Sequence, residues 1–217
     1  MSFKKPERLV GKFAVEAHQS RAMESVVGIV AIAASAGSLL PLTRLLSDLP
    51  RDFPAPVIVL QHRAPSSRLP EYLEQRVALP VREAAEGDVL CPGQVLVARP
   101  RIHITVNAAG RVRLLDTPPV RFIRPSADVL FRSLAQVYGE RTVAVVLSGG
   151  GHDGTAGSHA IRAAGGLVLA QDARSSDHPE MPISAFDLGK VDVILRPGQI
   201  GPALCALALA TAPSRVA

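Results

Sequence analysis

The chain has 217 residues, of which 47% are hydrophobic and 20% charged, a balance that allows a sizeable core and excludes global disorder. Its formal charge of +5 permits an acidic partner, such as a nucleic acid, an anionic membrane surface or an acidic protein. However, the basic residues are scattered, and the sequence has 2 Tyr, 6 Phe and no Trp, too few for a base-stacking platform. Nucleic-acid binding is therefore not expected.

The sequence carries no signal for a membrane or a secretory route. No apolar run approaches the roughly 18 residues of a membrane helix, so no membrane insertion is expected. The basic N-terminus lacks the apolar core of a signal peptide, which predicts a cytoplasmic protein. Cys91 and Cys205 form no CxxC and match no zinc spacing, so we expect ordinary buried or half-buried thiols.

The chain divides into one domain and two short ends. Residues before the first strand are polar and mixed, and the i, i+4 spacing of Leu9, Phe13 and Ala17 allows a short helix there. We expect an N-terminal extension over residues 1–25, a domain over 26–200 and a C-terminal helix or tail over 201–217.

The first half of the domain alternates strands and helices. The expected elements are a buried strand over 26–33, a helix capped by Ser38, a buried strand over 54–62 and a helix over 69–77. Pro41 suits the first turn of the helix after Ser38, and leucines from Leu39 to Leu49 form one apolar stripe along it.

The middle of the chain has a different pattern: short segments in which apolar and polar residues alternate, and a hairpin connection at residues 107–110. A marked helix over 125–139 follows, with Ser126 at its cap, Asp128 in its first turn and Gly139 after its end. The remaining expected elements are a strand over 142–149, a helix over 154–166 and strands over 167–172 and 191–195.

Strands that are apolar throughout and alternate with helices predict a mainly parallel sheet covered on both faces. The fold class is therefore α/β and doubly wound, and the hairpin in the middle is expected to add an antiparallel edge to the sheet.

Functional groups gather at the carboxyl ends of the strands in such sheets. Ser35 follows the first strand, His62 follows the second, and Asp153 lies in "SGGGHDG" (148–154) after the strand that begins at 142. Together they form the set that nucleophilic acyl transfer needs: a serine, a histidine that takes its proton, and a carboxylate that orients the histidine.

Each of these residues also has a simpler interpretation. Ser35 lies in "AASAG" (33–37), close to a G-x-S-x-G elbow that offers backbone N–H groups to an oxyanion, but a serine there can also just cap a helix. A histidine after an apolar strand is often structural, and we expect His103 and His152 to be surface or hairpin residues. A metal site from His62, His152, Asp153 and His178 has no supporting spacing.

Dinucleotide binding is the sharpest rival to the hydrolase interpretation. The loop over 149–154 satisfies G-x-G-x-x-G between a strand and a helix, and Asp172 ends the next strand at a distance suited to a ribose contact. Against this stands Asp153, whose negative charge would oppose a pyrophosphate in the same loop.

Several stretches in the same order also match a known family. They are "AASAGS" (33–38), "LQHRAP" (60–65), "REAAEGDVLCPGQVLVARP" (82–100), "RPSADVLFRSLAQVYG" (124–139), "LSGGGHDGTAG" (147–157), "IRAAGG" (161–166), "AQD" (170–172) and "MPISA" (181–185). Through them, residues 26–196 resemble the catalytic domain of the CheB-type chemotaxis receptor methylesterases.

The resemblance implies a serine hydrolase that demethylates glutamate methyl esters on chemoreceptor signalling helices, and that in some members also deamidates glutamines. By residue match, the catalytic serine, histidine and aspartate fall on Ser35, His62 and Asp153, and backbone N–H groups of Ala36 and Gly150 are the oxyanion donors. No metal or organic cofactor is implied, and the implied partner is a methylated receptor cytoplasmic domain.

The sequence departs from the family pattern at two loops. The serine is usually followed by Thr-Gly-Gly, and here by Ala36-Gly37-Ser38; the aspartate loop usually reads Thr-Gly-Met-Gly, and here Ser148-Gly149-Gly150-Gly151. Any residue except proline keeps the backbone N–H, so the donors survive. Without the threonine hydroxyl and the methionine wall, we expect a wider or less rigid site.

A third departure concerns regulation. About 25 residues precede the first strand, too few for the receiver domain of the familiar architecture, so a separate regulatory partner is one possibility. Two alternatives to a receptor methylesterase remain open. Because of the altered loops, the chain could be a catalytically weak receptor-binding module, and a general esterase on small substrates is the other alternative. The positive charge either steers the chain to acidic receptor regions or simply keeps it soluble.

Overall fold

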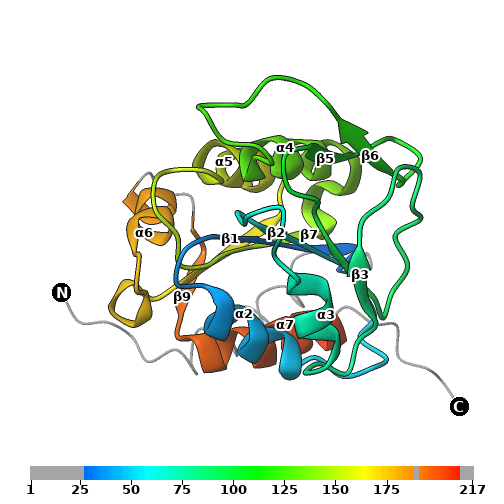
Figure 1. Ribbon diagram of the computed structural model, residues 1–217. Helices are drawn as coiled ribbons and strands as arrows, with labels where there is room; N and C mark the ends of the chain where they lie inside the picture. Colours follow the sequence, from blue (N-terminus) through cyan, green and yellow to red (C-terminus); the bar gives the residue numbers. More distant parts are fainter. Residues whose placement is uncertain (1–26, 188–190, 211–217) are drawn as a thin grey trace, which may run out of the picture.

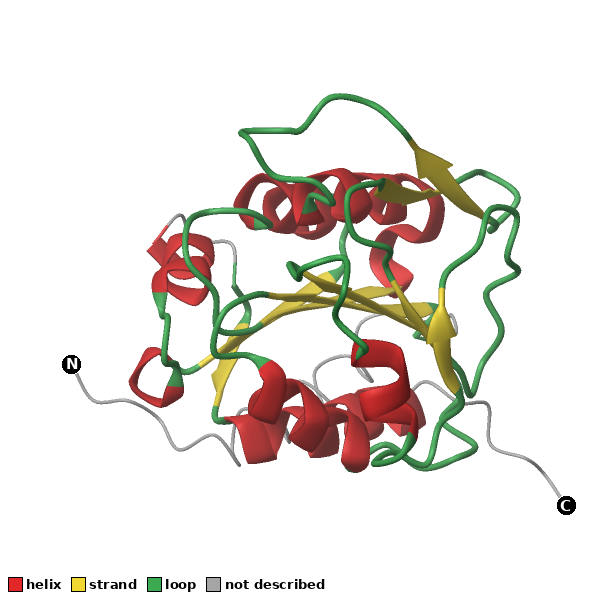
Figure 2. Cartoon of the chain, viewed as in Figure 1, coloured by secondary structure: helices red, strands yellow, loops and turns green. Residues whose placement is uncertain are grey.

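The computed structural model describes residues 27–187 and 191–210, which form a parallel sheet between two helical layers (Figure 1; Figure 2). The main sheet has seven strands in the order β3-β4-β2-β1-β7-β8-β9, and every pair in it is parallel. Its strands are β1 Ile29–Ala34, β2 Val57–Gln61, β3 Val81–Glu83, β4 Val95–Val97, β7 Thr142–Val146, β8 Leu167–Gln171 and β9 Val193–Leu195. The prediction of a doubly wound α/β fold is confirmed.

The helices cover both faces of this sheet, with α2, α3 and α7 on one side and α4 and α5 on the other, while α6 and β9 close one end (Figure 1). Their bounds are α2 Leu39–Ser47, α3 Leu69–Glu74, α4 Ala127–Tyr138, α5 Thr155–Ala163, α6 Glu180–Asp187 and α7 Pro197–Ala210. Two 3-10 turns, η1 Gly139–Arg141 and η2 Ala173–Ser175, complete the set of described helices.

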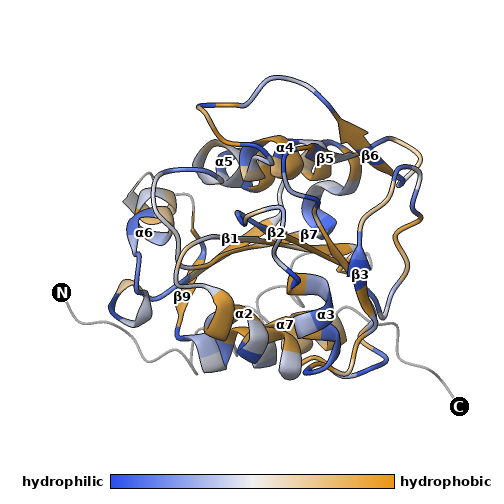
Figure 3. Cartoon of the chain, viewed as in Figure 1, coloured by the Kyte–Doolittle hydropathy of each residue, from blue (hydrophilic) through white to orange (hydrophobic). Residues whose placement is uncertain are grey.

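Strand β1 lies at the centre of the sheet and is buried along its whole length. Alternate side chains point to opposite faces, so Val30 and Ile32 pack with α2 and α7, whereas Ile29 and Ala31 pack with α4 and α5. Figure 3 shows the resulting apolar band through the middle of the molecule. Two-sided burial explains why the strand reads as a continuous apolar run.

The middle of the chain differs from the expectation. Instead of one antiparallel edge, it supplies two short parallel strands, β3 and β4, to the main sheet. The hairpin, β5 His103–Val106 and β6 Val112–Leu115, forms a separate antiparallel sheet that packs against α4. Its turn lies at residues 107–110 as predicted, where the Gly110 N–H donates to the Asn107 carbonyl at 2.8 Å.

The two cysteines lie in different environments. Cys205 in α7 is half-buried as expected, but Cys91 is exposed, because it lies in the loop between β3 and β4 rather than in the core. The proposed short helix before residue 26 lies outside the described residues. No helix in the described ranges is both long and apolar enough to cross a membrane.

Candidate functional site

The candidate site lies at the carboxyl ends of three adjacent strands, β2, β1 and β7. Strand β1 is the point at which the strand order switches direction, because β2 lies on one side of it and β7 on the other. Ligand crevices in open α/β sheets form at such switch points. A cavity of about 450 Å³ opens at this point, and both Ser35 and His62 line it.

Ser35 is held by its backbone rather than by its side chain. Its N–H donates to the Ser148 carbonyl at 3.0 Å, and its own carbonyl accepts from the N–H of Ser38 at 3.2 Å and from the Ser38 hydroxyl. Gln61 donates to that same hydroxyl at 3.0 Å. Among the described residues the Ser35 hydroxyl has no hydrogen-bond partner, so it is free to meet a ligand in the cavity.

Ser38 therefore occupies the N-cap position of α2, as predicted, but its side chain makes no capping bond. The Ser38 carbonyl makes the first backbone hydrogen bond of the helix, accepting from the Leu42 N–H at 2.8 Å. The hydroxyl is used to fix the turn that carries Ser35.

His62 and Asp153 form a direct pair, with the histidine Nε2 3.0 Å from the aspartate Oδ2. Because an ionised carboxylate only accepts hydrogen bonds, Nε2 carries the proton and Nδ1 of the neutral ring is the acceptor. The His62 backbone N–H also donates to the Ala34 carbonyl at 3.0 Å, which fixes the histidine beside the end of β1. The side chain of His62 is 19% exposed and that of Asp153 is 3% exposed, so the pair is partly shielded from water.

The first turn of α4 surrounds the Asp153 carboxylate with donors. Oδ1 accepts from the Ser126 hydroxyl at 2.7 Å and from the Asp128 N–H at 3.2 Å, and Oδ2 accepts from the Ala127 N–H at 2.6 Å. Ser126 has the extended backbone of an N-cap, yet its side chain does not cap α4. The Asp153 carboxylate, which comes from the loop after β7, caps α4 instead. Its negative charge therefore lies at the positive end of the helix dipole.

Burial by itself raises the pKa of Asp153, but the hydrogen bond from His62 and the donors of the α4 turn outweigh it and hold the pKa below its usual value. Asp128 behaves oppositely: burial raises its pKa, and the neighbouring Asp153 charge adds to this increase. At neutral pH, therefore, Asp153 is an ionised acceptor that keeps His62 in one tautomer.

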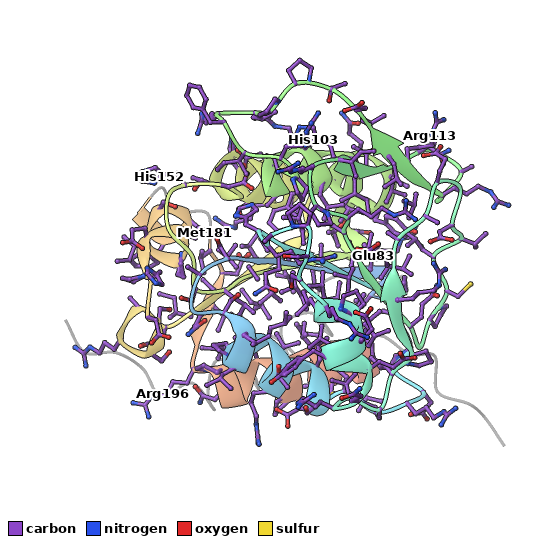
Figure 4. The ribbon with its side chains drawn as sticks, viewed as in Figure 1. Glu83, His103, Arg113, His152, Met181 and Arg196 are labelled. Carbon is purple, nitrogen blue, oxygen red and sulfur yellow. The ribbon has the colours of Figure 1, made fainter. Side chains whose placement is uncertain are left out.

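His103 supports the start of α4, where the donors to Asp153 lie, through a hydrogen bond to Ser126. It lies in the hairpin, as predicted, but it is fully buried beside α4 (Figure 4). Its Nδ1 accepts from the Ser126 N–H at 3.1 Å, and its Nε2 donates to the Pro118 carbonyl at 3.2 Å. This connection was not predicted, because nothing local in the sequence pairs a hairpin histidine with a helix cap. His152, in contrast, is exposed, as expected.

The loop after β7 is packed against Ser35. A Cβ atom placed on Gly149 would lie 2.6 Å from the Ser35 Cβ and 2.3 Å from the Met181 Sδ. Met181 is buried where α6 meets the sheet (Figure 4). A methionine therefore does stand beside this loop, contrary to the expectation, and it comes from α6, an element that the sequence analysis did not predict.

Ser148 ties the same loop to the turn after Ser35. Its hydroxyl lies 2.9 Å from the Ala36 carbonyl, to which it donates, and it accepts from the His178 N–H at 3.0 Å. Ser148 is fully buried. It thus supplies a hydroxyl that braces the turn, so the missing threonine does not leave the turn unsupported.

The backbone N–H groups of Ala36 and Gly150 have no hydrogen-bond acceptor among the described residues. Both residues are exposed, and a Cβ on Gly150 would meet no atom within 4 Å. Two unpaired donors next to Ser35 and Gly149 are available to an anionic oxygen. No three His, Cys, Asp or Glu side chains in the described ranges are grouped so as to hold a metal ion.

Known proteins resemble this chain in sequence and in fold. The family model for CheB methylesterase matches residues 30–204. The chain is 44% identical over 157 residues to a protein-glutamate methylesterase/protein-glutamine glutaminase from Myxococcus xanthus, covering 71% of this chain and 44% of that protein. It is 41% identical over 183 residues to one from Geobacter metallireducens, covering 83% of this chain and 53% of that protein.

The fold is also similar to the crystal structure of the Thermotoga maritima CheB methylesterase catalytic domain. The TM-score is 0.80 at 33% sequence identity, and the match covers 83% of this chain and 98% of the other. This chain spans about half the length of the curated relatives that it matches. By the extent of the family match and by this structural likeness, the chain belongs to the CheB methylesterase family.

Proposed function

We propose that the chain hydrolyses methyl esters of glutamate side chains on chemoreceptor signalling helices, with Ser35 as nucleophile, His62 as general base and Asp153 as its orienting carboxylate. One observation carries the proposal: the free Ser35 hydroxyl and the histidine of a fixed His62–Asp153 pair line the same cavity. The names of the relatives support the substrate class, since they are protein-glutamate methylesterases/protein-glutamine glutaminases.

In the first half-reaction, Ser35 Oγ attacks the ester carbonyl carbon while Nδ1 of His62 takes the hydroxyl proton. The Nε2–H of His62 keeps its hydrogen bond to Asp153, whose negative charge stabilises the imidazolium. The tetrahedral intermediate collapses by breaking the bond to the methoxy oxygen, which leaves as methanol with the proton from Nδ1. Glutamate is then held as an ester of Ser35.

In the second half-reaction, Nδ1 of His62 takes a proton from water as the water oxygen attacks the acyl-enzyme. The bond to Ser35 Oγ breaks, the serine recovers its proton, and a free glutamate carboxylate is released. The unpaired N–H groups of Ala36 and Gly150 stabilise the oxyanion in both steps. A glutamine side chain would follow the same route with ammonia in place of methanol.

The proposed partner is the methylated cytoplasmic domain of a chemoreceptor, and the proposed place of action is therefore the cytoplasm. The receptor adaptation regions are rich in Glu and Gln, so the formal charge of +5 would favour the encounter. A slower association at high salt is the expected sign of this steering.

The test is methanol release from a methylated receptor cytoplasmic fragment by the native chain and by Ser35→Ala. The variant should lose turnover by about 10⁴-fold or more, because the covalent step is gone. Ser66→Ala, which alters an exposed serine in the loop after His62, is the matched control and should retain activity. Turnover by Ser35→Ala would refute the role of the serine. Absence of turnover in the folded native chain would refute the proposed activity.

A further inference from the structure

A carboxylate lines the cavity that Ser35 also lines. Asp177, in the segment between η2 and α6, lines the cavity together with Ser35 and His62. A Cβ placed on Gly37 would lie 2.7 Å from the Asp177 Cβ and 3.1 Å from its Oδ2. The carboxylate thus lies against the residue two positions after Ser35.

The charge of Asp177 has no partner in the described part of the chain. Two other carboxylates near this end are paired: Glu83 with Arg63 at 2.7 Å and Asp153 with His62 at 3.0 Å. Asp177 makes no hydrogen bond or ion pair with any described residue, and it is exposed. Whatever enters the cavity therefore meets an unneutralised negative charge close to the reacting serine.

Part of the cavity lining is apolar. Leu39 and Leu40 begin α2 and line the same cavity, and they are 40% and 76% exposed, respectively. Lysine and arginine side chains combine a long apolar stem with a cationic head. Such a side chain fits these walls, with its stem on the leucines and its head at Asp177, whereas an acidic side chain would be repelled.

We propose that Asp177, Leu39 and Leu40 form a subsite for a lysine or arginine side chain of the substrate, next to the scissile ester. The inference rests on the proposed function and specifies its substrate: a glutamate ester with a basic residue on the same helix face is preferred over one with an acidic residue there. Residues four positions apart share a helix face, so the neighbour at i−4 or i+4 reaches the subsite.

The test uses helical peptides that carry one glutamate γ-methyl ester and either Lys or Glu at both i−4 and i+4. The native chain should hydrolyse the Lys peptide with a kcat/KM about tenfold higher at low salt, and the ratio should shrink as salt is added. Asp177→Asn should bring the ratio to within about twofold of one. Asp52→Asn removes the same charge from an exposed loop before β2, at the opposite end of the sheet, and should keep the native ratio.

A native ratio near one, or a ratio that survives Asp177→Asn, would overturn the subsite. Measuring peptide binding to inactive variants distinguishes a failure of the subsite from a failure of the proposed esterase activity. Ser35→Ala should bind the Lys peptide more tightly than the Glu peptide, and Ser35→Ala/Asp177→Asn should bind both alike. If the native chain turns over neither peptide, the esterase proposal fails, and the two binding constants still decide for or against the subsite.

Discussion

Replacing Asp153 by asparagine tests both the stability and the chemistry of the site. The carboxylate accepts four hydrogen bonds, two at each oxygen, and each oxygen faces one backbone N–H, of Ala127 or of Asp128. An asparagine places its NH₂ group on one side or the other. In either orientation a buried backbone donor loses its acceptor and meets another donor.

The size of the effect follows from these contacts. An unsatisfied buried donor costs about 1–3 kcal/mol, and bonds to a charged acceptor lose strength when the charge is removed. We therefore expect Asp153→Asn to lower the free energy of unfolding at pH 7 by about 2–4 kcal/mol. Turnover should fall by about 10⁴-fold, because the same substitution in a serine protease triad has that effect by favouring the wrong histidine tautomer.

The pH dependence has a definite sign. The pKa of Asp153 is lowered in the folded chain, so its contribution to stability is present above the usual carboxyl value of 3.8 and is lost as the pH falls toward the lower folded value. The stability difference between the native chain and Asp153→Asn should therefore narrow below about pH 4. Urea unfolding at several pH values measures this difference.

Asp128→Asn is the matched control on the same helix turn. Its Oδ1 accepts from the Gly157 N–H at 2.8 Å, a bond that an asparagine carbonyl can keep. Burial and the charge of Asp153 raise the pKa of Asp128, so loss of its charge should leave the protein equally or more stable at pH 7. Equal losses of stability in both variants, or full activity in Asp153→Asn, would refute the reasoning.

Two further changes probe the packing behind the site. Gly149→Ala should reduce kcat by about 10²-fold or more in the methanol-release assay, because its Cβ would displace Ser35 or Met181. Gly150→Ala keeps the backbone N–H and places its Cβ in open space, so its kcat should stay within a few-fold of native. His103→Leu should lower the free energy of unfolding by about 1–3 kcal/mol in urea, because the Ser126 N–H loses its acceptor; unchanged stability would show that this bond is dispensable.

The sequence by itself determined the fold class and the composition of the candidate site. Apolar runs between helices predicted a parallel sheet, because a strand buried on both faces cannot alternate with polar residues. The positions of Ser35, His62 and Asp153 after three such runs predicted that they would meet at one sheet end. The structure brings His62 and Asp153 into contact and places Ser35 and His62 on one cavity.

Sequence periodicity did not identify strand partners in the middle of the chain. β3 and β4 are only three residues long, too short for a pattern to distinguish a parallel edge from a hairpin. Cap positions were likewise predicted, but not the use of the cap side chains. Ser38 and Ser126 occupy N-caps while their hydroxyls bond to Ser35 and Asp153.

Only the tertiary structure decided what surrounds Ser35, His62 and Asp153. The donors around Asp153 come from α4, their support comes from His103 in the hairpin, and Met181 comes from α6. These residues lie tens of positions apart in the chain, and each has an ordinary local role as cap, strand residue or helix residue. Their function depends on distances between elements, which are set by core packing and sheet order and have no local signature in the sequence.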